Sequence, residues 1–201
     1  MLDPLLLTTA RISTFDGDWL LTRASGFFFI RKKRLFLVTS RHVLMDKASN
    51  HYPNRIEIEL HRDRENLTRS TILSIPLYQD GQRLWRQGYD GGGEVDVAAI
   101  EIDQQCLNNR FAIQYFSPAH LQDSFDEIDI GEMLLIVGFP LGFHDTLHHL
   151  PVVRQAVIAS AFGLRFQGYG YFLTDARTHR GSSGVCQGSC RVSHFTLPIF
   201  R

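Results

Sequence analysis

The sequence has few cysteines and no long apolar run. Its three cysteines, Cys106, Cys186 and Cys190, form neither a disulfide framework nor a Cys-x-x-Cys motif, which is typical of a reducing compartment. No run approaches the roughly 18 apolar residues that a membrane-spanning helix requires. Residues 1–7 lack the basic start and the long apolar stretch of a signal peptide. We therefore expect a cytoplasmic protein with no membrane partner.

Neither sign of charge is in excess, because the chain has 21 Lys and Arg residues and 21 Asp and Glu residues. This balance gives no electrostatic basis for binding nucleic acid, so no nucleic-acid partner is expected. A basic run at residues 31–34 lies between the apolar segments 27–30 and 35–38, which favours an exposed hairpin tip over a nucleic-acid patch. The 44% hydrophobic content excludes a disordered chain.

Short apolar segments separated by polar turns favour an all-β fold. Ile56, Ile58 and Leu60 alternate with glutamates, which is the period of a strand with one buried face. Further strands are expected at residues 71–75, 94–102, 132–137, 152–161 and 169–174, with a long loop at residues 80–93. Many short strands and few helical periods predict a β-barrel architecture.

The segment 174–184 contains a candidate nucleophile, Ser183, in a Gly-x-Ser-Gly turn. A serine hydroxyl attacks an acyl group only when a base lies within hydrogen-bond reach and N–H groups face the oxyanion that forms. Gly181 permits a sharp turn that would aim its own N–H and that of Ser183 into one oxyanion hole. Alone, however, such a match is more typical of a Gly/Ser surface turn.

The chain supplies candidates for the base and its orienting acid. His42 follows the apolar segment 35–38, and Asp96 lies near the start of the apolar segment 94–102. The order His42, Asp96, Ser183 is one of the chain orders in which catalytic triads occur. A capping or core role for His42 and a turn-capping role for Asp96 are the alternatives.

Four motifs carry a family resemblance. They are TSRHV at residues 39–43, DVAAI at 96–100, TDAxxxxGSSG at 174–184 and the turn VGFPLG at 137–142. In this order they resemble the trypsin-like (chymotrypsin-fold) serine peptidases of the bacterial type without structural disulfides. The resemblance extends from about residue 26 to residue 184.

The resemblance implies a fold of two six-stranded-type antiparallel β-barrels, the second of them incomplete. The N-terminal barrel would span residues 1–116 and carry His42 and Asp96. Residues 117–130 would link it to a partial C-terminal barrel, residues 131–201, that carries Ser183.

The resemblance also implies a serine endopeptidase that hydrolyses peptide bonds through an acyl-enzyme. Its partner would be a peptide or protein substrate, and no cofactor is implied; the oligomeric state is not indicated. Arg177 occupies the family's pocket-floor position, where a cation would favour acidic side chains, although an Arg177 turned to solvent is the favoured alternative. Asp175 is expected to have a structural role.

Two segments contain clusters of side chains that could bind a metal. His144 and His148 have the spacing of ligands on one helix face, but the surrounding prolines and glycines oppose a helix, which favours solvated loop histidines. Cys186, Cys190 and His194 lack a fourth ligand. No metal site is expected.

The tail after Ser183 departs from the family pattern. Residues 188–195 show no recognisable version of the closing strands that the family places there. We therefore expect a truncated or atypical C-terminus, and lower stability and activity than a chain with those strands would have. The alternative function is a catalytically inactive peptidase-like module that binds peptides or a protein partner.

Overall fold

The computed structural model describes residues 2–107, 111–121, 128–176, 186–191 and 194–196 of the chain. The strands are β1 (Thr9–Asp16), β2 (Trp19–Arg31), β3 (Arg34–Thr39), β4 (Arg55–His61), β5 (Ser70–Pro76), β6 (Tyr78–Gln79), β7 (Gln82–Arg83), β8 (Trp85–Asp90), β9 (Gly93–Ile102), β10 (Met133–Gly138), β11 (Val152–Val157), β12 (Cys186–Arg191) and β13 (His194–Thr196). The helical turns are η1 (Pro4–Leu7), α1 (Arg41–Leu44), α2 (Gln104–Leu107), η2 (Pro118–His120) and η3 (Pro140–Gly142). The predicted all-β class is confirmed. In the described ranges, no helix has the length and apolarity to cross a membrane.

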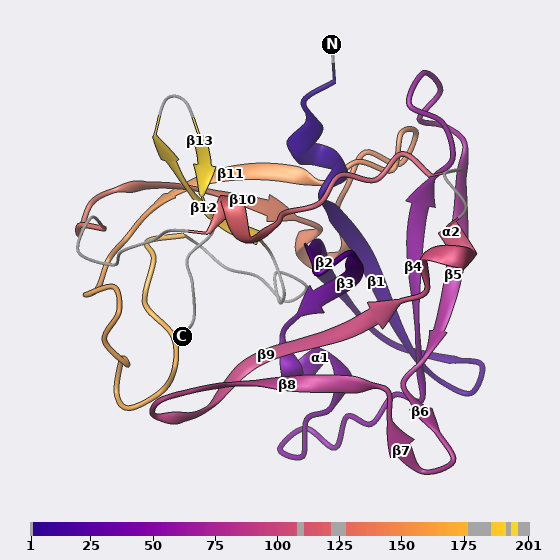
Figure 1. The fold of residues 1–201 in the computed structure, drawn as a ribbon, viewed down its shortest axis with the longest axis horizontal. Coiled ribbons are helices and arrows are strands. Elements are labelled where there is room, and N and C mark those ends of the chain that lie inside the picture. The colour runs from indigo at the N-terminus through magenta and orange to yellow at the C-terminus, as the bar shows by residue number, and fades with distance from the viewer. Residues whose placement is uncertain (1, 108–110, 122–127, 177–185, 192–193, 197–201) are drawn as a thin grey trace.

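Seven strands form one antiparallel sheet in the order β5-β4-β1-β2-β3-β9-β8 (Figure 1). One hydrophobic core contains side chains from all seven strands. Leu73 and Ile75 of β5 pack against it at one end of the strand order, and Trp85 of β8 is buried in it at the other end. The sheet therefore curls around a single core, as the strong twist of antiparallel strands allows.

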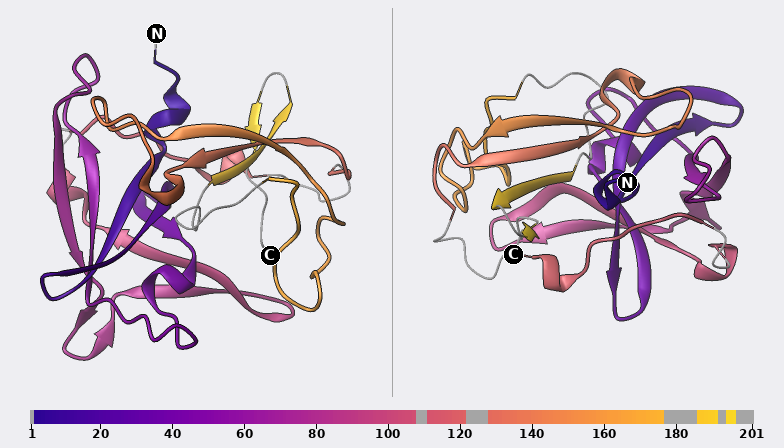
Figure 2. Two further views of the ribbon diagram at one scale, coloured as in Figure 1. Left: turned by 180° about the vertical axis from the view of Figure 1, so that it is seen from behind. Right: turned by 90° about the horizontal axis from the view of Figure 1, so that it is seen from above.

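A second sheet has the order β11-β10-β12-β13 and lies beside the first (Figures 1 and 2). Its core is small, with Leu134 and Ile136 of β10 buried together with Ala156 and Ile158. Four strands are described in this sheet, fewer than the six of a complete barrel. The division of the chain into domains at residues 116 and 131 stays a prediction.

The basic run forms the tip of the β2–β3 hairpin, as predicted. Arg31 pairs with Arg34, and the two residues between them, Lys32 and Lys33, have φ angles of 49° and 62°. Two consecutive residues with positive φ make the turn whose twist matches the flanking strands. Both lysines are exposed, so the tip is solvated.

Two of the predicted segments differ from the structure. The loop expected at residues 80–93 contains β7 and β8, because Trp85 is buried in the core while polar neighbours on the same strand face outward. The strand expected at residues 169–174 is irregular and makes only isolated bridges, such as that between Ile158 and Thr174. Its aromatic residues resemble a strand in composition, but its described backbone contacts with residues 157–159, such as the hydrogen bond from the Ala159 N–H to the Leu173 carbonyl, are too few for a regular ladder.

The tail contributes a strand that the sequence pattern does not indicate, since β12 pairs with β10 from Leu134↔Ser189 to Val137↔Cys186. A ladder uses backbone N–H and C=O groups, so a polar, cysteine-containing segment can complete an open edge without an apolar pattern.

Candidate active site

His42 lies on α1, the single helical turn that follows β3. The buried Thr39 ends the strand, and its hydroxyl donates a hydrogen bond of 2.7 Å to the Ser25 carbonyl. Val43 and Leu44 are buried and anchor the turn in the core of the first sheet. With these two side chains pointing inward, His42 is held at the surface of the turn.

Asp96 lies where the ladder between β8 and β9 is irregular. Gln87 pairs with Ala98 and Tyr89 pairs with Glu94, so residues 95–97 lie opposite Gly88 alone. A Cβ on Gly88 would lie 2.9 Å from Val95 Cγ2, so the close approach requires glycine. Such bulges redirect a side chain out of the regular alternation.

The carboxylate of Asp96 binds His42 at two points. His42 Nδ1 lies 2.6 Å from Asp96 Oδ2, and the His42 backbone N–H donates to Asp96 Oδ1 at 3.0 Å. A proton held on Nδ1 by the carboxylate makes Nε2 the basic nitrogen of the neutral ring. This is the relation between base and orienting acid in a catalytic triad.

The hydrogen bond to Asp96 raises the pKa of His42 above its ordinary value. Burial and the charge of Arg41 act in the opposite direction, whereas the charges of Asp96 and Asp46 add to the increase. The His42 side chain is 42% exposed, so a substrate in solution can reach it. Asp96 Oδ1 also lies 4.0 Å from Arg41 Nε, so the carboxylate contacts a cation as well as the imidazole.

The structure thus brings together two of the sequence-predicted site residues, His42 and Asp96. Ser183, Gly181 and Arg177 lie outside the described residues. Asp175, just before them, accepts a hydrogen bond of 2.8 Å from the Val157 N–H, which agrees with the structural role expected for it.

The histidines of the segment after β10 have partners other than metal. The Nδ1 of His144 lies 2.6 Å from the Gly142 carbonyl, and the Nδ1 of His148 lies 2.7 Å from the Asp145 carboxylate. His149 lies 2.9 Å from Glu59 of the first sheet, a contact that sequence reasoning missed because no spacing rule links the two positions. No group of three metal-ligating side chains occurs in the described part of the chain.

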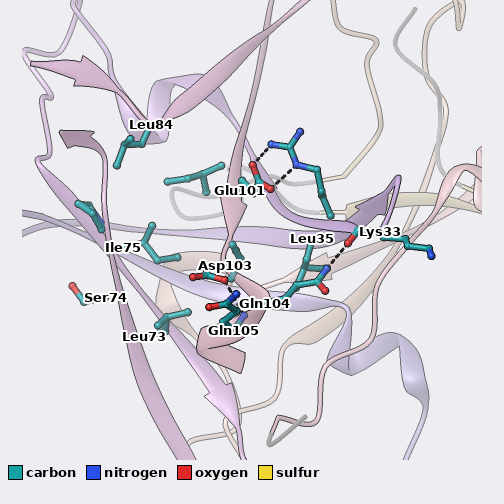
Figure 3. A pocket seen from close by; sticks show the side chains of 14 residues that line it. Lys33, Leu35, Leu73, Ser74, Ile75, Leu84, Glu101, Asp103, Gln104 and Gln105 are labelled. Carbon is teal, nitrogen blue, oxygen red and sulfur yellow. Dashed lines mark hydrogen bonds and ion pairs between the residues drawn. The ribbon is translucent and has the colours of Figure 1, made fainter. Parts of the chain in front are cut away.

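Sequence reasoning also missed a pocket of about 670 Å³ beside the first sheet (Figure 3). Leu73 and Ile75 of β5 line one side, and Ile100 and Ile102 of β9 line another. Arg34 and Glu101, which form an ion pair, also line it. Neither His42 nor Asp96 lines this pocket, so it is separate from the candidate site.

Comparison with known proteins places this geometry in a known fold. No protein-family model matches the chain, and no curated protein matches it either. Among solved structures, a scabies mite inactivated protease paralogue is 17% identical, with a TM-score of 0.55 over 96% of this chain and 91% of that one. The HtrA-type protease AlgW, with a tripeptide, is 18% identical, with a TM-score of 0.52 over 95% of this chain and 54% of that one.

A serine endoprotease from Yersinia pestis is 15% identical, with a TM-score of 0.52 over 92% of this chain and 50% of that one. The chain therefore spans about half the length of the Yersinia and AlgW proteases. At identities this low the likeness concerns the fold, and the mite paralogue shows that inactivated proteins also have it. The chain has the trypsin-like serine protease fold.

Proposed function

We propose that the chain is a serine endopeptidase that hydrolyses peptide bonds through an acyl-enzyme. The observation that carries the proposal is the contact of 2.6 Å between His42 Nδ1 and Asp96 Oδ2. A surface histidine whose Nδ1 is held by a carboxylate is arranged to take a proton at Nε2. A fold shared with serine proteases and the Gly-Ser-Ser-Gly segment at residues 181–184 point in the same direction.

In the proposed reaction, His42 Nε2 takes the proton of the Ser183 hydroxyl as its oxygen attacks the peptide carbonyl. The N–H groups of Gly181 and Ser183 would hold the oxyanion, and Asp96 would stabilise the charged imidazole. His42 then gives the proton to the leaving amine, and water hydrolyses the acyl-enzyme by the reverse sequence. Arg177 is proposed, more weakly, as a pocket residue that would favour acidic side chains.

Labelling of the folded chain with a fluorophosphonate probe tests this proposal, with Ser183→Ala as the blank. We expect labelling at Ser183, and a decrease in labelling rate on the order of 10⁴-fold in Asp96→Asn, because the ring loses the acceptor that fixes its tautomer.

Asp46→Asn is the matched control, since Asp46 acts on His42 only through its charge and is bound locally by Ser49. We expect its labelling rate to change little. A folded chain that the probe does not label would contradict the proposal and favour an inactive peptide-binding module.

A further inference from the structure

The part of β9 that carries Asp96 has little support from neighbouring strands. The ladder between β3 and β9 ends at Thr39↔Ala98, before Asp96 is reached. On the other side, residues 95–97 form the bulge opposite Gly88, where regular pairing with β8 is interrupted. Residues 95–97 therefore have fewer ladder hydrogen bonds than a regular strand, so contacts from outside the two neighbouring strands contribute more to their position.

Arg165, in the segment between β11 and β12, contacts this end of the β8–β9 hairpin with its guanidinium. Its Nε and Nη2 donate to the two carboxylate oxygens of Asp90 at 3.2 and 2.7 Å. Nη2 also donates to the Glu94 carbonyl at 3.2 Å, two residues before Asp96. Such bidentate pairing of guanidinium and carboxylate fixes orientation as well as distance.

The guanidinium is itself held in place by its own turn and by close packing. Nη1 donates to the Gly168 carbonyl at 2.8 Å. A Cβ on Gly92 would collide with the Arg165 side chain, and a Cβ on Gly170 would lie 2.5 Å from Val95 Cγ1. The segment therefore fits tightly under the bulge, next to the buried side chain of Val95.

The ion pair is partly shielded from solvent. The side chains of Arg165 and Asp90 are only 26% and 16% exposed. The hydrogen bond from Arg165 lowers the pKa of Asp90, so the carboxylate stays charged across the neutral range. Half-buried, bidentate pairs of this kind contribute more than exposed single contacts.

We propose that Arg165 is a positioning residue for the His42–Asp96 pair: by binding Asp90 and the Glu94 carbonyl, it holds the bulge so that Asp96 reaches His42. The proposal concerns the geometry of Arg165, Asp90, Asp96 and His42, and only its consequence for hydrolysis rests on the proposed function. Arg165 touches neither His42 nor a reacting atom, so its effect passes through Asp96.

The first test is the titration of the His42 ring by NMR in the full chain, comparing the parent with Arg165→Met. Among the described residues, the charged groups whose effect on the His42 pKa is resolved are Asp96 of β9, Arg41 on its own turn and Asp46 just after it. We expect the pKa of His42 to fall toward that of an unpaired imidazole, because Asp96 is no longer held in place. Simple loss of a cation would instead raise it, so the sign of the change separates positioning from long-range charge.

Gly92→Ala provides a second variant that displaces the Arg165 side chain without changing any charge. We expect the pKa of His42 to fall in it as well, by a smaller amount. The exchange Asp90→Arg with Arg165→Asp restores an ion pair and should return part of the lost pKa. Arg34→Met is the matched control, since it removes the Arg34–Glu101 pair at the other end of β9 and should leave the His42 titration unchanged.

If the chain is a peptidase, Arg165→Met should also lower kcat by roughly 10- to 100-fold with little change in KM, because a misplaced base slows the chemical step. An unchanged or raised pKa of His42 in Arg165→Met would overturn the proposal; should that variant fail to fold, an unchanged pKa in Gly92→Ala would do so. A parent chain without peptidase activity would refute the proposed function and leave the titration as the test of positioning.

Discussion

The two sheets of the chain differ in how much core they enclose. Seven strands surround the first core, and it includes fully buried residues on several of them, such as Ile12 of β1, Leu37 of β3 and Ile58 of β4. The described core of the second sheet rests on Leu134, Ile136, Ala156 and Ile158. Since stability grows with the apolar area removed from water, the first sheet should be the more stable unit.

The segments around the second sheet are connected to the first sheet by hydrogen bonds and an ion pair. The Phe139 N–H donates to the buried Ser25 hydroxyl at 2.8 Å, and His61 Nε2 lies 2.6 Å from the His148 carbonyl. Arg165 makes a third such connection, to Asp90. The candidate base His42 and its candidate acid Asp96 therefore belong to the well-packed part of the chain, and the proposed positioning residue Arg165 comes from the segment between β11 and β12.

A pair of core truncations should give the largest effect and test this contrast directly. We expect Leu37→Ala to lower the free energy of unfolding near the upper end of the range of about 2–5 kcal/mol, and Leu134→Ala near its lower end. Both leucines are almost fully buried, so the difference reports how well each surrounding core can relax. Urea unfolding measures both, and equal losses would contradict the contrast.

Two glycine substitutions should give the next largest effect. A Cβ on Gly26 would lie 2.8 Å from Ile12 Cδ1 and 3.0 Å from the Val38 carbonyl oxygen, whereas one on Gly91 would meet nothing within 4 Å. We expect Gly26→Ala to destabilise the chain by about 1–3 kcal/mol through overpacking, and Gly91→Ala to be nearly neutral. Thermal melting checks this, and a neutral Gly26→Ala would show that the first core is loosely packed.

Glu59 of β4 contacts His149 from the segment between β10 and β11, and it should contribute more to stability than the exposed Glu101 does. Burial raises the pKa of Glu59, but the hydrogen bond from Ser70 and the charges of Arg11 and His149 outweigh it, so the net pKa is lowered. We expect Glu59→Gln to reduce stability by on the order of 1 kcal/mol at neutral pH and Glu101→Gln to have a smaller effect.

The sign of the pH dependence follows from the lowered pKa. The contribution of Glu59 is fully present above its ordinary, unfolded-state pKa and is lost as the pH falls through the lower folded-state value. The stabilities of the parent and Glu59→Gln should therefore converge at acidic pH. A difference that stays constant with pH would show that the carboxylate charge is not involved.

The smallest expected effect is at the exposed Asp145–His148 pair. The hydrogen bond from His148 lowers the pKa of Asp145 to about 2, helped by the backbone N–H groups of Leu147 and His148. NMR titration should show this low pKa in the parent and a partial return toward the ordinary value in His148→Ala. Stability should change little, because both side chains are largely in solvent.

Much of the strand pattern could be predicted because it depends on local alternation. Ile56, Ile58 and Leu60 are all buried, as their spacing indicates. The strand β8 was missed because it contains a single large apolar anchor, Trp85, among polar residues and a glycine. The strand β12 was missed because it completes the edge of β10 through backbone groups, which leave no signature in residue types.

By itself, the sequence determined the all-β class and marked His42 and Asp96 as candidates, since residue types and chain order carry that information. Only the tertiary structure decided that the two side chains meet at 2.6 Å. That contact depends on α1 being anchored by the buried Val43 and Leu44 and on the bulge opposite Gly88. The tertiary structure also brings Arg165 to Asp90. Close approach between segments far apart in the chain follows from packing and leaves no trace in local spacing.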